Sequence, residues 1–187
     1  MKKNEIEIIE AAIRVLSRYG VKRTTMNDIA EEAGVVRQTL YNLYKNKNDV
    51  LRGTTRYVMA QMLEEIQQNA YGSEKLSDQL DVVFNVYAIQ SYEMVANLPD
   101  AKDILSGVVE IVAKEKAEAI KLLTQEVINL LSPYKAPIEA NGLDIETYAD
   151  FIMISLSFIK MEAKSRGHLD EYLSVLKANI LVVCQSS

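Results

Sequence analysis

The sequence contains very little cysteine, proline and glycine. Its 187 residues include one cysteine, three prolines, seven glycines and no tryptophan. The single cysteine, Cys184, excludes an internal disulfide framework and is typical of a reducing, cytoplasmic setting. We interpret it as a small buried hydrophobe, with an intermolecular disulfide as the alternative. The scarcity of proline and glycine favours long helices over a sandwich of short strands.

Long apolar runs are also missing. No stretch approaches the roughly 18 residues that a membrane-spanning helix needs, so no membrane partner is expected. The N-terminal segment MKKNEIEIIEAA has two lysines with no apolar core behind them, which is not the pattern of a signal peptide. We therefore expect a cytoplasmic protein.

The residue patterns of enzymes and metal sites are equally scarce. The sequence has no glycine-rich phosphate loop, no Cys/His metal spacing and no nucleophile–base set, so no cofactor, metal or enzymatic activity is predicted. The only histidine, His168, is expected in a solvated loop. Glu146 and Asp150 are one helical turn apart, as paired catalytic carboxylates would be. Both also lie early in a predicted helix, where the helix dipole stabilises acidic side chains, and this is sufficient to explain them. A metal-assisted enzyme would need the side chains of Asp144, Glu146, Asp150 or His168 to converge.

Positive charge is concentrated at one end of the chain. The formal net charge is −5, which by itself argues against a nucleic-acid partner. Residues 1–56 carry eleven Lys/Arg and seven Asp/Glu, a net charge of +4, whereas the remainder carries ten and nineteen, a net charge of −9. A basic first third on an acidic body indicates a polyanionic partner at one end of the protein, with chance clustering as the alternative.

Apolar residues recur at helical spacing along the chain. The first predicted helix ends at Gly20 and has the apolar stripe Ile6, Ile9, Ala12, Ile13 and Leu16. Breaks and periodicity together predict an all-α protein of about nine helices, with a short piece at 100–105 and one clear loop at 132–142. We place the domain boundary after residue 47, which gives a small helical domain in residues 1–47 and a larger helical domain in residues 48–187.

The clearest motif is a pair of short helices joined by a glycine. Thr25 is expected to cap the first of them, with Asp28 as the acid of a capping box. Gly34 is free to adopt the left-handed conformation that a tight turn requires. The residues expected to face inward are Ile29, Ala30, Ala33, Val35, Leu40 and Leu43, with Tyr44 on their flank. This pattern predicts a helix-turn-helix unit, in which the second helix enters the DNA major groove.

The outward side chains of the second helix are suited to DNA. Arg37 can pair with guanine and Gln38 with adenine, while the methyl groups of Val36 can meet a thymine methyl. Tyr41 and Lys47 are suited to phosphate oxygens, and the amides at the start of the preceding helix offer another phosphate site. The full set of predicted DNA-contacting residues is Thr25, Val36, Arg37, Gln38, Thr39, Tyr41, Asn42, Lys45 and Lys47.

The N-terminal segment resembles the DNA-binding domain of TetR-type transcriptional regulators over residues 6–51. The residues on the family pattern are Ala11-Ala12, Gly20, Thr25, Ile29-Ala30, Ala33-Gly34-Val35, Leu40-Tyr41, Tyr44, Lys47 and Leu51. The resemblance implies a homodimer on a palindromic double-stranded DNA operator, with a small-molecule effector of unknown identity in the C-terminal domain that loosens DNA binding. The leading hypothesis is therefore a ligand-responsive repressor. The alternative is a helical small-molecule-binding protein with a vestigial DNA-binding head.

Two positions depart from the family pattern. Val36 stands where the family usually has serine, and the loss of a capping oxygen costs about 1 kcal/mol. Val36 is therefore either a base contact or a poorer cap. Tyr44 stands where phenylalanine is common, and its hydroxyl is expected to reach solvent or a phosphate.

Two further surfaces are predicted in the C-terminal domain. Hydroxyls along an apolar helical stripe predict a ligand pocket, with an ordinary core as the alternative. Its candidate lining is Met59, Met62, Phe84, Tyr87, Ser91 and Tyr92. The last two helices are apolar on more than one face, so a second subunit is expected to cover them in a four-helix interface, with a monomer as the alternative. The predicted interface residues are Ile152, Ile159, Leu173, Leu176, Ile180 and Val183.

Overall fold

The computed structural model describes residues 3–96 and 108–185. Every regular element within these ranges is a helix, which confirms the all-α prediction. The short piece predicted at 100–105 lies outside them. Across the described residues no helix is both long enough and apolar enough to cross a membrane. Contacts divide the described chain into a first unit, residues 3–61, 94–96 and 108–119, and a second unit, residues 62–93 and 120–185.

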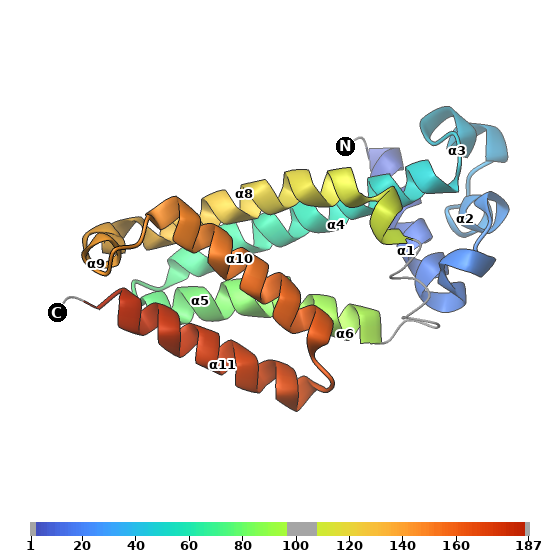
Figure 1. Cartoon of the computed structure of the whole chain (residues 1–187). Coiled ribbons are helices and arrows are strands. Elements are labelled where there is room, and N and C mark those ends of the chain that lie inside the picture. Colours follow the sequence, from blue (N-terminus) through green and yellow to red (C-terminus); the bar gives the residue numbers. More distant parts are fainter. Residues whose placement is uncertain (1–2, 97–107, 186–187) are drawn as a thin grey trace. The chain divides into compact units, whose positions relative to one another are not determined.

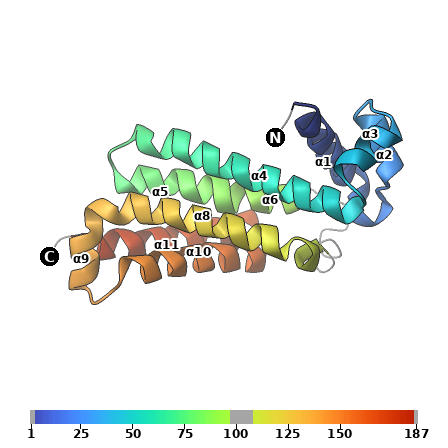
Figure 2. The same ribbon diagram turned by 90° about the horizontal axis from the view of Figure 1, so that it is seen from above.

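The first unit is built around three N-terminal helices, which lie together in Figures 1 and 2. These helices are α1 (Lys3–Arg23), α2 (Met26–Glu32) and α3 (Arg37–Leu43). Two long helices, α4 (Lys47–Asn69) and α8 (Ala113–Leu131), begin in this unit and continue into the second.

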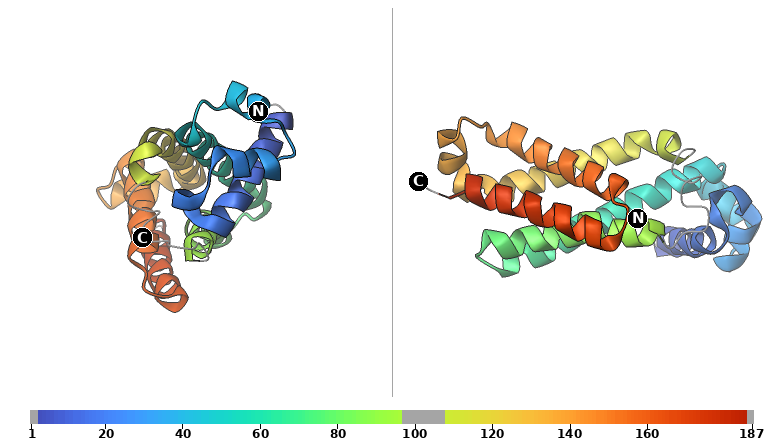
Figure 3. Two further views of the ribbon diagram at one scale, coloured as in Figure 1. Left: turned by 90° about the vertical axis from the view of Figure 1, so that its right-hand side faces the viewer. Right: turned by 60° about the horizontal axis from the view of Figure 1, so that its bottom comes forward.

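The second unit contains most of the remaining helices. After a 3₁₀ turn (Ala70–Gly72) come α5 (Leu76–Phe84), a π-helical turn (Asn85–Ile89) and α6 (Gln90–Ala96), whose last residues belong to the first unit. The chain ends with α9 (Lys135–Ala140), α10 (Ile145–Glu162) and α11 (Arg166–Val183). Helices α10 and α11 form an antiparallel pair, visible side by side in Figure 3.

Local capping signals account for several helix boundaries. The predicted capping box is confirmed, since the Thr25 hydroxyl accepts from the Asp28 amide at 3.2 Å and the Thr25 amide donates to the Asp28 carboxylate at 2.8 Å. The Asn46 side chain accepts from the Asp49 amide at 3.0 Å and so caps α4. The predicted stop at Gly20 is also confirmed, because its φ of 74° breaks α1 before its last residues.

The loop predicted at 132–142 is wrong, because this segment forms a 3₁₀ turn (Ser132–Tyr134) followed by α9. Both of its prolines occupy first turns, where a helix has no need of their missing N–H groups. The fully buried side chain of Ile138 anchors α9.

The prediction that His168 lies in a loop is also wrong. This residue lies in the first turn of α11, where its Nδ1 accepts from the Lys164 amide at 3.2 Å.

The core of the first unit joins α1, α2, α3 and the start of α4. Its buried members are Ile8, Ile9, Ala12, Val15, Ile29, Ala30, Leu40, Tyr44 and Val50. The prediction that Leu43 faces this core is wrong, since its side chain is 45% exposed. The helix ends at Leu43, and the extended backbone of the next residue, Tyr44, turns the tyrosine ring inward in its place.

Candidate nucleic-acid interface

The turn between α2 and α3 depends on Gly34. Its φ of +64° lies in the left-handed region, which side chains with a Cβ adopt at a cost, although a Cβ here would meet no atom within 4 Å. The Gly34 and Val35 amides donate to the Glu31 and Ala30 carbonyls at 3.1 and 3.0 Å, which closes the end of α2. The turn therefore fixes the point at which α3 begins.

Val36 occupies the N-cap of α3. Its backbone is extended and its carbonyl accepts from the Thr39 amide at 2.9 Å, but its side chain makes no capping hydrogen bond. The isopropyl group is 70% exposed. Val36 is thus a cap without a capping oxygen and, at the same time, an apolar group at the tip of the helix.

Polar side chains cover the outer face of α3. Arg37, Gln38, Tyr41 and Asn42 are exposed, and Thr39 is half-buried. The Gln38 Nε2 donates to the Asn42 Oδ1 at 2.9 Å, which orients both amides on one face. The second N–H and the carbonyl oxygen of Gln38 remain for an external partner, the pair that adenine recognition needs.

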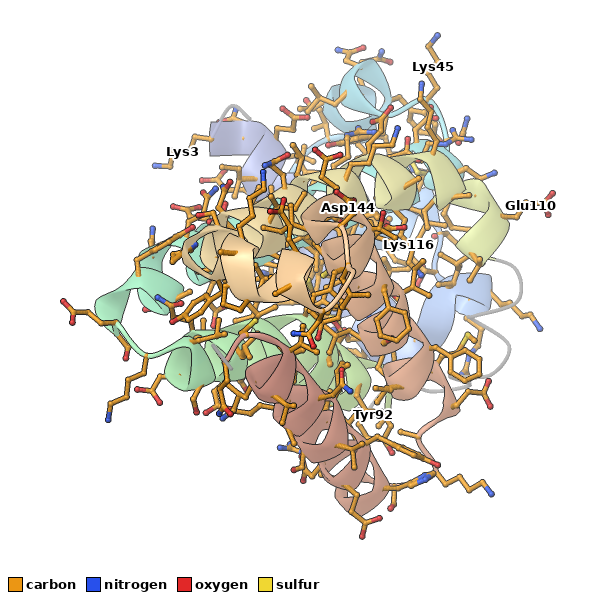
Figure 4. The ribbon with its side chains drawn as sticks, turned by 60° about the vertical axis from the view of Figure 1, so that its left-hand side comes forward. Lys3, Lys45, Tyr92, Glu110, Lys116 and Asp144 are labelled. Carbon is orange, nitrogen blue, oxygen red and sulfur yellow. The ribbon has the colours of Figure 1, made fainter. Side chains whose placement is uncertain are left out.

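Two cations are available near this face. Neither Arg37 nor Lys45 takes part in an ion pair within residues 3–96 and 108–185. Figure 4 shows Lys45 extending from the chain just beyond α3. Both side chains are exposed, so each can contact a polyanion without first breaking a salt bridge.

Lys47 has an internal role. Its ammonium donates to the Val21 carbonyl at 2.8 Å and to the Thr24 carbonyl at 3.0 Å. The Val21 carbonyl lies in the last turn of α1 and the Thr24 carbonyl directly after the helix, where a cation both satisfies backbone acceptors and interacts favourably with the helix dipole. The structure thus gives Lys47 a structural function beside its predicted phosphate contact.

Part of the positive charge of the N-terminal segment is used within the first unit. Arg14 and Arg18 lie 2.7 and 3.4 Å from the two carboxylate oxygens of Glu32, joining α1 to α2. The hydrogen bond from Arg14 is the main cause of a lowered pKa of Glu32. Arg56 pairs with Glu115 at 3.3 Å, joining α4 to α8.

Tyr44 holds the end of α3 to the rest of the first unit. The prediction that its hydroxyl reaches solvent or a phosphate is wrong, since it donates to the Glu5 carboxylate at 3.2 Å and the residue is buried. Burial, followed by the nearby charge of Glu5, raises the pKa of Tyr44 to about 12.

The predicted ligand-pocket residues differ in their burial, and one of them lies on a crevice. Met62, Phe84 and Tyr87 are buried in the second unit, and Met59, Ser91 and Tyr92 are half-buried. The Tyr87 hydroxyl is 2.7 Å from that of Ser157, and the Lys160 ammonium lies 3.6 Å from the centroid of the Tyr87 ring. Tyr87 is the one predicted residue on a narrow crevice, which is lined by Ile66, Val83, Tyr87, Leu123, Glu126, Val127 and Met153.

Sequence reasoning missed Glu126. This residue is only 6% exposed, and it follows Leu123 and precedes Val127 and Leu130 on the buried stripe of α8. An acid at a position of the apolar stripe is the signal that could have identified it.

The predicted dimer residues are mostly buried within their own subunit. Ile152, Leu173, Leu176 and Ile180 are buried and Ile159 and Val183 are half-buried, so the prediction that these side chains form an outer interface needs correction. A different set is exposed on α10 and α11: Phe151, Ile154, Phe158, Met161, Tyr172, Val175 and Val182. On each helix these residues recur at helical spacing, so each helix has an apolar outer stripe.

The acids considered for catalysis serve as helix caps or lie on the surface. The Asp144 carboxylate accepts from the Thr147 amide at 2.8 Å and caps α10, and this bond is the main cause of its lowered pKa. Glu146 lies in the first turn of the same helix, as the dipole interpretation predicted. Within the described ranges no three His, Cys, Asp or Glu side chains are grouped as a metal site.

A tight turn joins α2 to the short helix α3, whose outer face is polar and partly cationic, and together they define a helix-turn-helix protein. Residues 8–53 match the family described as bacterial regulatory proteins, tetR family. This segment of the chain belongs to that family.

Individual relatives agree with this assignment. The fatty acid metabolism regulator protein of Bacillus subtilis (strain 168) is 32% identical over 87 residues, which cover 44% of this chain and 45% of that protein. A protein of Escherichia coli (strain K12) named as an acrEF/envCD operon repressor is 42% identical over 48 residues, or 26% of this chain and 22% of that protein. The matches thus span less than half the length of either relative.

The fold is shared over nearly the whole chain. The structure of the fatty acid degradation regulator FadR from Bacillus halodurans has a TM-score of 0.70 and 19% identity, covering 94% of this chain and 95% of that chain. At this identity the likeness concerns the fold.

Proposed function

We propose that the protein is a ligand-responsive transcriptional repressor that binds a palindromic DNA operator as a homodimer. In this proposal, residues 1–47 form the DNA-binding domain, and residues 48–187 bind the effector and form the dimer. The observation that carries the proposal is the outer face of α3, where Arg37 and Gln38 are exposed at the start of a helix held in place by a glycine turn.

The chemistry of this face supports sequence-specific binding. Arg37 is suited to the O6 and N7 atoms of guanine, and Gln38 to the N6 and N7 atoms of adenine. Lys45 and Tyr41 are suited to phosphates, which set the register of the helix in the groove. Lys47 would contribute a phosphate contact only in addition to its bonds to the Val21 and Thr24 carbonyls.

The outer stripe of α10 and α11 supports the dimer. Large apolar side chains such as Phe158 and Val175 lie exposed on adjacent antiparallel helices. Packing this pair against its copy around a two-fold axis would bury both stripes in a four-helix arrangement. A two-fold dimer presents two α3 helices, which matches a palindromic operator.

An effector would act by favouring a dimer whose two reading helices no longer fit successive grooves. Helix α4 begins directly after the DNA-binding residues and is shared by both units, so a change in the second unit can be carried along one continuous element. The sequence relative named as an operon repressor agrees with repression as the output.

Selection of bound duplexes from a random DNA pool, with the full-length protein, tests this function. The proposal predicts an enriched inverted repeat whose half-sites are separated by about one helical turn. A pool that remains random after repeated rounds would argue for the alternative, a small-molecule-binding protein with a vestigial DNA-binding head.

A further inference from the structure

Glu126 is a buried carboxylate for which the proposed repressor mechanism has no use. It is the only buried acidic side chain among the residues that the structure describes. No ion pair is formed by Glu126 within residues 3–96 and 108–185. A buried carboxylate is expensive unless hydrogen bonds or a cation satisfy it, so its position in an apolar stripe calls for a partner.

Two neutral side chains presently satisfy this carboxylate. The Gln67 Nε2 donates to one oxygen at 3.1 Å, and the Tyr71 hydroxyl donates to the other. Both donors belong to residues with exposed side chains, and Tyr71 is 52% exposed. Rotation of these two side chains would therefore free both carboxylate oxygens of Glu126 from their present hydrogen bonds, without any movement of a helix.

The crevice beside Glu126 is apolar. Five of its seven lining residues are aliphatic or methionine side chains, and Tyr87 provides an aromatic wall. The crevice is too narrow to admit a water molecule, so an apolar group can enter it only when its lining side chains move apart. The hydroxyl of Tyr87 is hydrogen-bonded to Ser157, and the Lys160 ammonium lies over one face of its ring.

The charge of the surrounding unit favours a cation. Residues 62–93 and 120–187 contain fourteen acidic and seven basic side chains, a formal net charge of −7. Such a field attracts cationic ligands and repels anionic ones. A primary ammonium also carries three N–H donors, enough to replace those of Gln67 and Tyr71 at once.

We propose that Glu126 is the recognition group of the effector site, and that the effector is an apolar molecule bearing a primary or secondary ammonium group. The ammonium replaces the Gln67 and Tyr71 donors at the carboxylate, and the apolar part enters the crevice. This inference rests on the proposed effector site in the second unit and names the chemical class of its ligand.

Three probes with one phenylbutyl frame test the inference by calorimetry on the full-length protein without DNA. 4-Phenylbutylamine is cationic, 4-phenylbutanol is neutral and 4-phenylbutyrate is anionic. The inference predicts that the amine binds at least about tenfold more tightly than the other two, as expected for a hydrogen-bonded charge. Equal affinities, tighter binding of the acid, or no amine binding at millimolar concentration would overturn it.

Variants assign the preference to the carboxylate. Glu126→Gln keeps the size of the side chain and is expected to abolish the preference for the amine, whereas Glu118→Gln, on the exposed side of the same helix, should retain it. Circular dichroism checks that both variants are folded. If Glu126→Gln fails to fold, Tyr71→Phe provides the test. This variant removes a hydrogen-bond donor that competes with the ammonium, so it should bind the amine more tightly. An unchanged affinity for the amine would contradict the inference.

The outcome is separable from DNA binding. A protein that selects an operator but ignores the amine would retain the proposed regulatory function and lose only the assignment of its ligand class. A protein that binds the amine through Glu126 but selects no DNA would lose the repressor function and retain the ligand site.

Discussion

The ring of Tyr44 lies against the backbone of Gly53. A Cβ at residue 53 would be 2.8 Å from Cε1 and 3.0 Å from the hydroxyl oxygen of Tyr44, and 3.1 Å from the Cδ1 of Ile9. Because Gly53 has no side chain, the Tyr44 ring at the end of α3 can pack directly against the backbone of α4. Through Tyr44, the orientation of the proposed reading helix depends on a residue of the following helix.

Gly53→Ala is expected to destabilise the protein despite the better helix propensity of alanine. Propensity favours alanine by about 1 kcal/mol, but overpacking of a filled core costs typically about 1–3 kcal/mol. Chemical denaturation should show a net loss, and Tyr44→Leu in the same chain should reduce it by removing the atoms that clash. A stabilised Gly53→Ala variant would show that the ring moves aside without cost.

Lys47 and Lys45 are expected to have different functions although both follow α3. Lys47→Met removes two hydrogen bonds to the carbonyls of Val21 and Thr24 and should lower the free energy of unfolding by about 1–3 kcal/mol. Lys45→Met should leave stability unchanged and weaken binding to any duplex. Denaturation and fluorescence anisotropy on both variants measure the two effects, and equal stabilities would contradict the capping role of Lys47.

Val36→Ser separates the two interpretations of Val36. The serine hydroxyl can cap α3, so the melting temperature should rise by about 2–4 °C, equivalent to about 1 kcal/mol in a chain of this size. If the valine also reads a thymine methyl, replacing thymine by uracil in the selected operator should weaken the wild-type protein and leave Val36→Ser unaffected. Equal sensitivity of the two proteins to uracil would show that Val36 does not contact the thymine methyl.

The first unit should lose stability in acid. Hydrogen bonds from Thr25 lower the pKa of Asp28 below its usual 3.8, and those from Arg14 lower the pKa of Glu32 below its usual 4.5. Because both values are depressed in the folded state, their stabilising effect is full above about pH 4.5 and is lost as the pH falls through the folded values. Thermal melting between pH 7 and pH 3 measures this loss. In the variant Arg14→Gln, the melting temperature should depend less on pH, because the contribution of Glu32 is reduced. An unchanged profile would count against the ion pair.

The outer stripe of α10 and α11 should be required for the dimer. Phe158→Glu places a charge at the centre of this stripe and is expected to yield the mass of a single chain in light scattering, because an unpaired charge is costly to bury at an interface. Leu122→Glu, at an exposed apolar position of α8, is the matched control and should leave the dimer intact. A monomeric wild-type protein would exclude the interface altogether.

Local signals were sufficient to predict the helix-turn-helix unit. The capping box of Thr25 and Asp28, the stop at Gly20 and the turn at Gly34 involve residues within a few positions of each other, so the sequence contains all the information that they need. The outward side chains of α3 follow from the same short-range geometry. Their contacts with DNA remain predictions.

Features that depend on distant residues were not predictable in the same way. The bond between Tyr44 and Glu5 joins residues 39 positions apart, and Lys47 reaches carbonyls 23 and 26 positions away. In α10 and α11 both helix faces are apolar, so periodicity alone could not decide which stripe is buried in the subunit. The stripe that contains Ile152 is the buried one, and the stripe that contains Phe158 is exposed.

The most direct test of the central claim, that α3 reads DNA sequence, is the affinity of Arg37→Ala for the selected operator and for a random duplex. Base readout by Arg37 predicts a loss of about 1–3 kcal/mol, or roughly tenfold to more than a hundredfold, on the operator and little change on random DNA. Lys45→Met should instead weaken both duplexes alike. Equal losses on the two duplexes for Arg37→Ala would contradict the claim.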